Sequence, residues 1–262
     1  MPDPRDYQTE AVIISKIKLG EADRILTLCT PDHGKIRAVA KGVRRPNSKM
    51  AGHLELLTYS QIRLARGRNL ETVTGCQTIE AFIPLKNDLW LTSSGLYAAE
   101  LINQFTVEHL PNPVLFQLFL ETLHRLSRAE CPDLTLRYFE LHLLELAGFR
   151  PQLHECVACR LELRPEVNAF HPAGGGILCT ACRVDYPASF DISLDALKVL
   201  RLFQRSSFAV VSRLKVSSGL AQELKSTLAA YIRFLLERDV KSAAWLDTLA
   251  GQSGPGPEKT AV

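Results

Sequence analysis

The sequence predicts a multidomain α+β protein: a small N-terminal five-stranded β-barrel, then an α-helical domain interrupted by a four-cysteine module. Three observations lead to this fold class. Residues 1–82 consist of short β-branched runs separated by turn residues. After Pro84 the apolar residues recur with the helical period of about 3.6. Two Cys-x2-Cys pairs lie between the helical segments, which indicates a small metal-bound unit.

Five segments of the N-terminal region are expected to form strands. They are rich in apolar and β-branched residues, and turn signals such as Pro31-Asp32-His33-Gly34 separate them. Their ranges are 9–19, 24–30, 35–43, 54–66 and 70–79. Short strands with little helix between them favour a small closed barrel.

The charge of this region is strongly positive, although the net charge of the chain is only +3. Residues 35–68 contain nine Lys or Arg residues against one acidic residue, Glu55. Lys35, Arg37 and Lys41 occupy alternate strand positions, so their side chains project from one face. The residues expected to contact a polyanion are Lys35, Arg37, Lys41, Arg44, Arg45, Lys49, Arg66 and Arg68. A solvated surface is the alternative interpretation of these charges.

A barrel that binds a polyanion favours the oligonucleotide-binding (OB) fold, although strand count alone fits an SH3-like barrel equally well. Residues 1–80 contain only Tyr7 and Tyr59 as aromatic residues, so rows of stacking platforms are missing. We therefore expect binding dominated by phosphate contacts, with little sequence preference and a steep dependence on salt.

Helical periodicity defines the second part of the chain. Ser93 or Ser94 is expected to begin a helix that ends before Pro111, and residues 114–127 are apolar nearly all round, which indicates burial between other helices. A third helix is expected at 134–147, with Gly148 as its stop. Ser193 is expected to begin a further helix. The last apolar stripe contains Leu220, Leu224, Leu228, Tyr231, Ile232 and Leu235.

The cysteine pairs Cys156-x2-Cys159 and Cys179-x2-Cys182 can aim four sulfurs at one point. Four thiolates complete the tetrahedral shell that Zn²⁺ prefers, so we expect one structural zinc ion per chain and no open catalytic position. Two disulfides or four unrelated buried thiols are the alternatives. His154 and His171 lie nearby, but a histidine beside a complete cysteine set is usually a bystander.

These patterns divide the chain into domains. The expected domains are a basic, DNA-binding OB domain at 1–82, a helical domain at 83–150 and 190–248, a zinc module at 151–189 and a disordered tail at 249–262. The zinc module is too short to bury a sufficient core by itself, which explains the metal. The N-terminus does not read as a signal peptide, and no apolar run approaches about 18 residues. Together with three cysteines outside the zinc set, this predicts a cytoplasmic protein without a membrane span.

No motif of an enzyme could be identified. The phosphate-binding loop of ATPases is missing, and so are the His-x-Glu and Pro-Cys-x-x-Cys elements of zinc deaminases. No spacing argues for a Ser/His/Asp triad or a carboxylate pair. We therefore expect a non-catalytic binding protein.

Four blocks of the chain carry a family resemblance, in the right order and over nearly its whole length. GEADRILTLCTPDHGKIRAVAKGVRR contains the first set: Glu21, Asp23, Arg24, Thr30, His33, Gly34, Lys35, Ala38, Ala40, Lys41, Gly42 and Arg44. GLYAAEL, LRYFELHLLELAGF and the CVAC…CTAC pair follow. The chain resembles the RecO family, bacterial recombination mediators of DNA repair, in its zinc-bearing branch. Some members lack the cysteines, so zinc does not define the family.

The resemblance implies a function and partners. A RecO-like protein binds single- and double-stranded DNA, anneals complementary strands, and works with RecR, often also RecF, to load RecA on strands coated by single-strand-binding protein. It acts in recombination and repair after DNA damage, including the SOS response, at the nucleoid. The resemblance also implies that the helical domain binds the acidic C-terminal tail of the coating protein, with Arg137 suited to the tail carboxylate. Tyr138 stands where a second basic residue can occur in the family.

Two other functions fit the same sequence. An RNA-binding or ribosome-associated protein is the main alternative, because OB barrels and zinc ribbons also bind RNA. A protein-interacting scaffold is the third, and it requires that the basic residues play no part in nucleic-acid binding.

Overall fold

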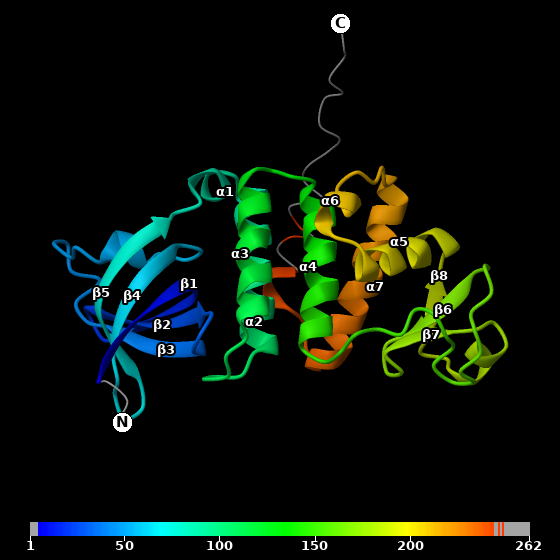
Figure 1. Ribbon diagram of the computed structural model, residues 1–262, viewed down its shortest axis with the longest axis horizontal. Coiled ribbons are helices and arrows are strands. Elements are labelled where there is room, and N and C mark those ends of the chain that lie inside the picture. The colour runs from blue at the N-terminus through cyan, green and yellow to red at the C-terminus, as the bar shows by residue number, and fades with distance from the viewer. Residues whose placement is uncertain (1–4, 244–245, 247, 249–262) are drawn as a thin grey trace, which may run out of the picture.

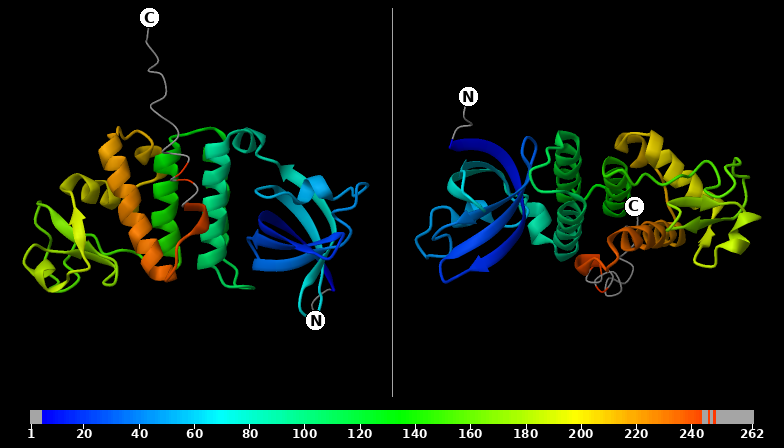
Figure 2. Two further views of the ribbon diagram at one scale, coloured as in Figure 1. Left: turned by 180° about the vertical axis from the view of Figure 1, so that it is seen from behind. Right: turned by 90° about the horizontal axis from the view of Figure 1, so that it is seen from below.

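The computed structural model describes residues 5–243, 246 and 248. Its parts lie in a row, with a barrel at one end, helices in the middle and a small sheet at the other end (Figures 1 and 2). The tail predicted at 249–262 lies outside the described residues. None of the helices described here has both the length and the apolar character needed to cross a membrane.

The barrel is a closed sheet of five strands in the order β1-β2-β3-β5-β4. The strands are β1 (Asp6–Leu19), β2 (Asp23–Thr30), β3 (Gly34–Ala40), β4 (Tyr59–Ala65) and β5 (Glu71–Glu80). The long strand β1 pairs with both β2 and β4, with a bulge between Ile13 and Ser15, and β3 pairs in parallel with β5. This order closes the sheet without free edges, so the predicted OB-type barrel is confirmed.

One predicted strand starts later than expected. The segment predicted as 54–66 becomes a strand only at Tyr59, because Ala51–Leu54 forms a 3-10 helix and Leu57 has a positive φ of 56°. Leu54 is buried in the barrel core, whereas Leu57 is buried in the core of the helical region. The apolar run at residues 54–57 resembles a strand because its leucines are buried in two different cores. The strand predicted at 35–43 likewise ends at Ala40.

Seven helices make up the described helical region. They are α1 (Ile83–Asn87), α2 (Leu89–Phe105), α3 (Pro113–Ser127), α4 (Pro132–Leu146), α5 (Leu194–Arg205), α6 (Phe208–Val211) and α7 (Ser218–Leu236). Helices α2 and α3 lie beside the barrel, and α4 lies between them and α5 and α7 (Figure 1). Ser193 caps α5 by accepting a hydrogen bond from the Ala196 N–H at 3.1 Å, as predicted. Gly148 has a φ of +86° just after α4 and thus confirms the predicted stop.

The predicted start of α2 is wrong. Asp88 caps this helix by accepting from the Leu91 N–H at 2.8 Å, and Ser93 and Ser94 are buried inside it. Their hydroxyl groups donate to the carbonyls of the preceding turn, at 2.7 and 2.9 Å. A serine inside a helix can satisfy its hydroxyl in this way, so its presence does not mark a helix start.

A small sheet lies between α4 and α5 in the chain. It contains β6 (Asn168–His171), β7 (Gly176–Leu178) and β8 (Phe190–Ile192), none of which was predicted, in the order β7-β6-β8. Two side chains of α5 bind the segment between α4 and β6. Arg201 Nε donates to the Leu153 carbonyl at 2.8 Å, and Gln204 Nε2 donates to the Pro151 carbonyl at 2.9 Å.

The barrel is joined to the helices through the start of β3. The Lys35 carbonyl accepts from the His109 N–H at 3.0 Å, and Lys35 Nζ donates to the Asn103 carbonyl at 2.7 Å. Gly34 has a φ of +67°, and a Cβ atom there would lie 2.2 Å from the Leu110 carbonyl oxygen. Glycine therefore lets the loop 106–112 approach the barrel.

Replacing Gly34 with alanine is expected to destabilise the protein by about 3 kcal/mol, because the backbone conformation and the contact with Leu110 both oppose a side chain. Gly20→Ala is the matched control: its φ is +55°, but nothing lies within 4 Å of its Cβ position. For this control we expect a loss of about 1 kcal/mol. Denaturant unfolding measures both values, and equal losses would show that the contact with Leu110 is unimportant.

Candidate nucleic-acid interface and candidate metal centre

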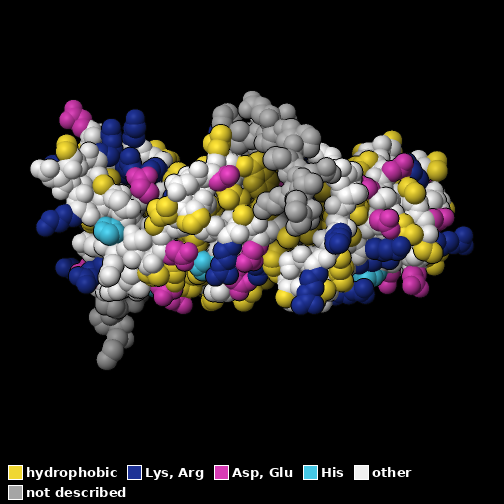
Figure 3. Space-filling view, turned by 90° about the horizontal axis from the view of Figure 1, so that it is seen from above, with side chains coloured by type: hydrophobic (Ala, Val, Ile, Leu, Met, Phe, Trp, Pro, Cys, Tyr) yellow, Lys and Arg dark blue, Asp and Glu magenta, His cyan; other side chains and the backbone are white. Residues whose placement is uncertain are grey.

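Strand β3 presents its basic side chains outside the barrel. Ile36, Ala38 and Ala40 are buried in the barrel core, and Lys35 and Arg37 alternate with them on the outer face. The alternation predicted from the sequence is therefore confirmed for Lys35 and Arg37, whereas Lys41 lies beyond the end of β3. Lys and Arg side chains are visible at the barrel end of the molecule, and others lie along the helical region and at the opposite end (Figure 3).

Lys35 is nevertheless set apart from the other basic residues. Its amino group is directed at the Asn103 carbonyl, and burial lowers its pKa, while Glu108 opposes this shift. The amino group of Lys35 therefore points toward the helical region, and its hydrogen bond joins the barrel to the helices. The geometry gives Lys35 a structural role, and its contact with DNA stays a prediction.

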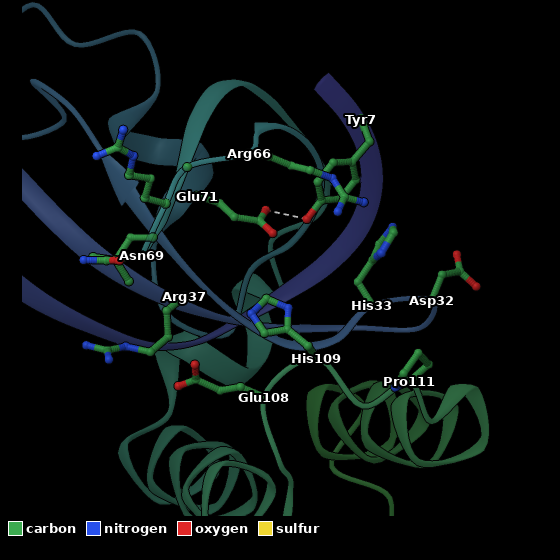
Figure 4. A pocket seen from close by; sticks show the side chains of 13 residues that line it. Tyr7, Asp32, His33, Arg37, Arg66, Asn69, Glu71, Glu108, His109 and Pro111 are labelled. Carbon is green, nitrogen blue, oxygen red and sulfur yellow. Dashed lines mark hydrogen bonds between the residues drawn. The ribbon is translucent and has the colours of Figure 1, made fainter. Parts of the chain in front are cut away.

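Arg37, Arg66 and Arg68 line one pocket of about 340 Å³. The other residues that line it are Tyr7, Asp32, His33, Gly67, Asn69, Leu70, Glu71, Glu108, His109 and Pro111 (Figure 4). The arginines come from β3 and the β4–β5 turn, and the last three residues come from the loop 106–112 of the helical region. Two parts of the chain that are distant in sequence thus build one pocket.

Tyr7 is the centre of the contacts inside this pocket. Its hydroxyl group donates a hydrogen bond to Glu71, its ring lies 4.5 Å from the His33 ring, and the Arg66 guanidinium lies 5.3 Å from its centroid. Tyr7, His33 and Glu71 are half-buried. These contacts fix the position of the Tyr7 side chain in the pocket.

The remaining basic residues form a second group beyond β3. Lys41, Arg45 and Lys49 are exposed around a shallow hollow of about 680 Å³. Arg44 is also exposed, and its guanidinium donates to the Gly20 carbonyl at 3.2 Å. The structure therefore brings the predicted residues together as two separate groups on the barrel, with three in the pocket and four around the loop after β3.

Sequence reasoning missed the pocket residues that are not basic. His109 lies in a loop that follows α2, and its position beside β3 depends on the backbone contact with Lys35. Tyr7 stands out in the sequence only as one of two aromatic residues of the barrel region. Glu71 is acidic, whereas a polyanion site is expected to contain basic residues. His33 belongs to a block of the family resemblance, which is the one signal that could have singled it out.

The four predicted cysteines form a second site at the other end of the molecule. The sulfurs of Cys156, Cys159, Cys179 and Cys182 all lie within 4.8 Å of one another, and these residues are the one such group among the described residues. Cys159 and Cys179 are 3.9 Å apart between sulfurs, much longer than a disulfide of about 2.05 Å. The described cysteines are free thiols, so the disulfide alternative is not supported.

The electrostatics of this cluster favour a bound cation. Burial opposes ionisation of Cys156, but backbone N–H groups of Cys159, Cys179 and Ala158 outweigh it and lower the pKa of Cys156 to about 6. Cys182 behaves in the opposite way, since hydrogen bonds from its thiol to the Cys179 and Cys159 sulfurs raise its pKa to about 12. Cys156 therefore ionises more readily than Cys182. A metal ion at this position would favour the thiolate form of its ligands.

Arg137 lies inside the helical region, on α4. Its side chain is only 7% exposed, and its guanidinium pairs with the Glu140 carboxylate. Burial raises the pKa of Glu140, while Arg137, Tyr97 and Lys225 oppose that shift. Because Arg137 is enclosed and already paired with a carboxylate, its position does not favour the predicted contact with a partner's tail. A sequence motif identifies the residue type but does not predict whether the side chain is exposed.

Replacing Glu140 alone with leucine is expected to cost about 3–5 kcal/mol of stability, because the Arg137 charge is then buried without its partner. The double variant Arg137→Met/Glu140→Leu removes both charges and is expected to be about as stable as the unchanged protein. Chemical denaturation compares them. A double variant as unstable as the single one would mean that packing and not charge dominates here.

Comparison with known proteins identifies the family. The family model described as Recombination protein O N terminal matches residues 4–82, and the model described as Recombination protein O C terminal matches residues 86–244. DNA repair protein RecO of Dehalococcoides mccartyi strain BAV1 is 45% identical over 249 residues, which cover 95% of this chain and 98% of that protein. The RecO proteins of Roseiflexus sp. strain RS-1 and Desulforamulus reducens strain MI-1 are 42% and 32% identical over 243 residues. These matches cover 93% of this chain and 86% and 94% of the two relatives.

The two family models cover the closed basic barrel and the helical region that follows it. The class is therefore that of recombination proteins built from these two parts. The chain belongs to the RecO family.

Proposed function

We propose that this protein binds single- and double-stranded DNA through its barrel, anneals complementary strands and helps to load RecA on strands coated by single-strand-binding protein. The observation that supports DNA binding best is that Arg37, Arg66 and Arg68 line one pocket, while Lys41, Arg45 and Lys49 are exposed around a separate hollow of the same barrel. Guanidinium groups match phosphate geometry and stay charged at all relevant pH values. The names of the relatives, DNA repair protein RecO, support the same role.

The mechanism of annealing follows from charge neutralisation. Two complementary strands repel each other through their phosphates, and cationic side chains that bind phosphates lower this repulsion. The basic residues here contact the backbone, so the base edges of most nucleotides stay available for pairing. In this mechanism the protein makes and breaks no covalent bond, and we propose that it is not an enzyme.

Zinc is proposed as a structural ion held by Cys156, Cys159, Cys179 and Cys182. Four sulfurs that converge without a fifth donor suit a closed tetrahedral shell, which stabilises the fold around it and leaves no position for a substrate. The cluster ties the segment 155–160 to the segment that follows β7.

The family resemblance supports the remaining parts of the proposal. These are cooperation with RecR and often RecF, binding of the C-terminal tail of single-strand-binding protein, and action at the nucleoid in the cytoplasm. The tail is expected to bind a surface of the helical region other than the enclosed guanidinium of Arg137.

Annealing of two complementary oligonucleotides, one of them labelled, tests the proposed function. The protein is expected to accelerate annealing at low salt and to lose this effect as salt rises, because each phosphate contact on a single strand releases about 0.7 counterion. A structured RNA of similar length is the control ligand. No acceleration of DNA annealing, together with tight RNA binding, would overturn the proposal in favour of an RNA-binding function.

A further inference from the structure

The pocket beside β3 has two walls of different chemistry. One wall is the β4–β5 turn, where Arg66, Arg68 and Asn69 are exposed. A second wall contains His33 from the β2–β3 turn and His109 from the loop 106–112. In Figure 4 the His109 ring points into the space between these walls. Arg66 reaches across to the Tyr7 ring, which His33 also contacts, so cationic groups and flat rings both border this space.

The half-buried carboxylate of Glu71 lies between the two walls (Figure 4). Tyr7 donates one hydrogen bond to it, and a carboxylate has about four acceptor sites, so it can accept further bonds. A phosphate placed deep in the pocket would be repelled by this charge. Asp32 and Glu108 also line the pocket, so its acidic and basic residues are equal in number. A pocket for phosphates alone would not be built in this way.

The size of the pocket limits its occupant. Its volume of about 340 Å³ lies at the lower end of the range of about 300–1,000 Å³ for small-molecule sites. This space suits one nucleobase with its sugar. Flat rings at His33 and His109 suit the face of a base, and the exposed Arg66 and Arg68 suit the adjoining phosphates.

We propose that this pocket holds one unpaired nucleotide of a bound single strand. The phosphates lie against Arg66 and Arg68, the base enters between the histidines, and the Glu71 carboxylate accepts a hydrogen bond from an amino group of the base. Cytosine offers such a donor at N4, where thymine has the O4 acceptor. Cytosine is therefore favoured over thymine, which adds a modest base preference to the phosphate-dominated binding. This inference rests on the proposed DNA binding.

Binding of two oligonucleotides, all cytosine and all thymine, tests the role of Glu71 by fluorescence anisotropy. The unchanged protein is expected to bind the cytosine strand about fivefold more tightly. Glu71→Gln is expected to abolish this preference, because an amide can donate to O4 as well as accept from N4. Glu10→Gln is the matched control, since Glu10 also accepts a hydrogen bond from a tyrosine hydroxyl, that of Tyr59, and does not line the pocket. The control is expected to keep the preference.

His109→Ala tests the wall that the helical region supplies. We expect roughly a tenfold loss of affinity for single strands, with an unchanged salt slope, because a stacking contact is lost and no phosphate contact is. Leu110→Ala, an exposed neighbour in the same loop that does not line the pocket, is expected to bind as the unchanged protein does. Thermal melting of each variant confirms that the fold is intact.

The outcomes separate this inference from the proposed function. If Glu71→Gln keeps the cytosine preference, or if His109→Ala binds normally, the nucleotide pocket is refuted while DNA binding stands. If the unchanged protein binds neither strand, the proposed function fails and the inference fails with it. Loss of preference in Glu71→Gln alone, with Glu10→Gln unaffected, supports the pocket.

Discussion

Replacing Cys156 and Cys179 with serine is expected to abolish binding of the proposed zinc ion and to unfold the small sheet between α4 and α5. Each pair of ligands loses one thiolate, and two sulfurs cannot hold the ion at the affinity of four. Zinc contributes about 10–16 kcal/mol to the folding of small zinc-bound units, more than the small core of this segment can replace. Metal analysis is expected to find about one zinc ion per chain in the unchanged protein and none in this variant.

The control for this prediction is Cys131→Ser. Cys131 is exposed and lies outside the four-sulfur group, so its replacement is expected to change stability by less than about 0.5 kcal/mol and zinc content not at all. Limited proteolysis locates the damage: cleavage of the double variant is expected within residues 151–189 and not within the barrel. A double variant that resists proteolysis there would contradict a structural role of the metal.

Replacing Arg37, Arg66 and Arg68 with glutamate is expected to give the largest loss of function. If each arginine contacts one phosphate, their loss reduces the slope of log affinity against log salt by about 2 on a single strand. Affinity at low salt is expected to fall about 100-fold or more, because the reversed charges also repel the strand. Annealing is expected to be lost at every salt concentration. Anisotropy titrations across a salt series, with the annealing assay beside them, measure both effects.

The matched control reverses three exposed charges of the helical region. Arg128, Arg213 and Lys215 are exposed and lie outside the pocket, so their replacement with glutamate changes the net charge equally. We expect little change in the salt slope. An equal loss in both variants would show that overall charge, and no particular site, attracts DNA. Lys35 is left unchanged, since its replacement would also weaken the joint between the barrel and the helices.

The fold could be predicted where neighbouring residues of a strand or helix are buried in the same core. Alternation in β3 identified its buried face because Ile36, Ala38 and Ala40 fill one barrel core. The same reasoning failed for residues 54–58, whose leucines pack into two cores, a fact that no local pattern records. The start of α2 was misplaced for a related reason, since a serine hydroxyl can find a hydrogen-bond partner within a helix as well as at its start.

The candidate sites differ in how far the sequence could predict them. The four-cysteine cluster was predicted completely, because two turns with fixed spacing determine its geometry. The basic pocket was predicted in part: residue type and parity identified Arg37, but only the fold brings His109 to its side. For Lys35 and Arg137, charge alone did not indicate the contacts within the chain, which are to the Asn103 carbonyl and to Glu140. Burial and pairing depend on tertiary contacts, which a single sequence does not contain.

The four-cysteine cluster lies between α4 and α5 in the chain, and this position affects how fast the protein folds. Helix α4 ends at Leu146 and α5 begins at Leu194, yet the two helices meet, with a hydrogen bond of 3.1 Å between His142 and the Phe203 carbonyl. Bringing them together closes a long loop, and the entropy lost grows with loop length. A metal that first condenses the intervening segment shortens the effective loop. The ion would thereby act on helices that it does not touch, by setting how quickly the two halves of the helical region find each other after synthesis.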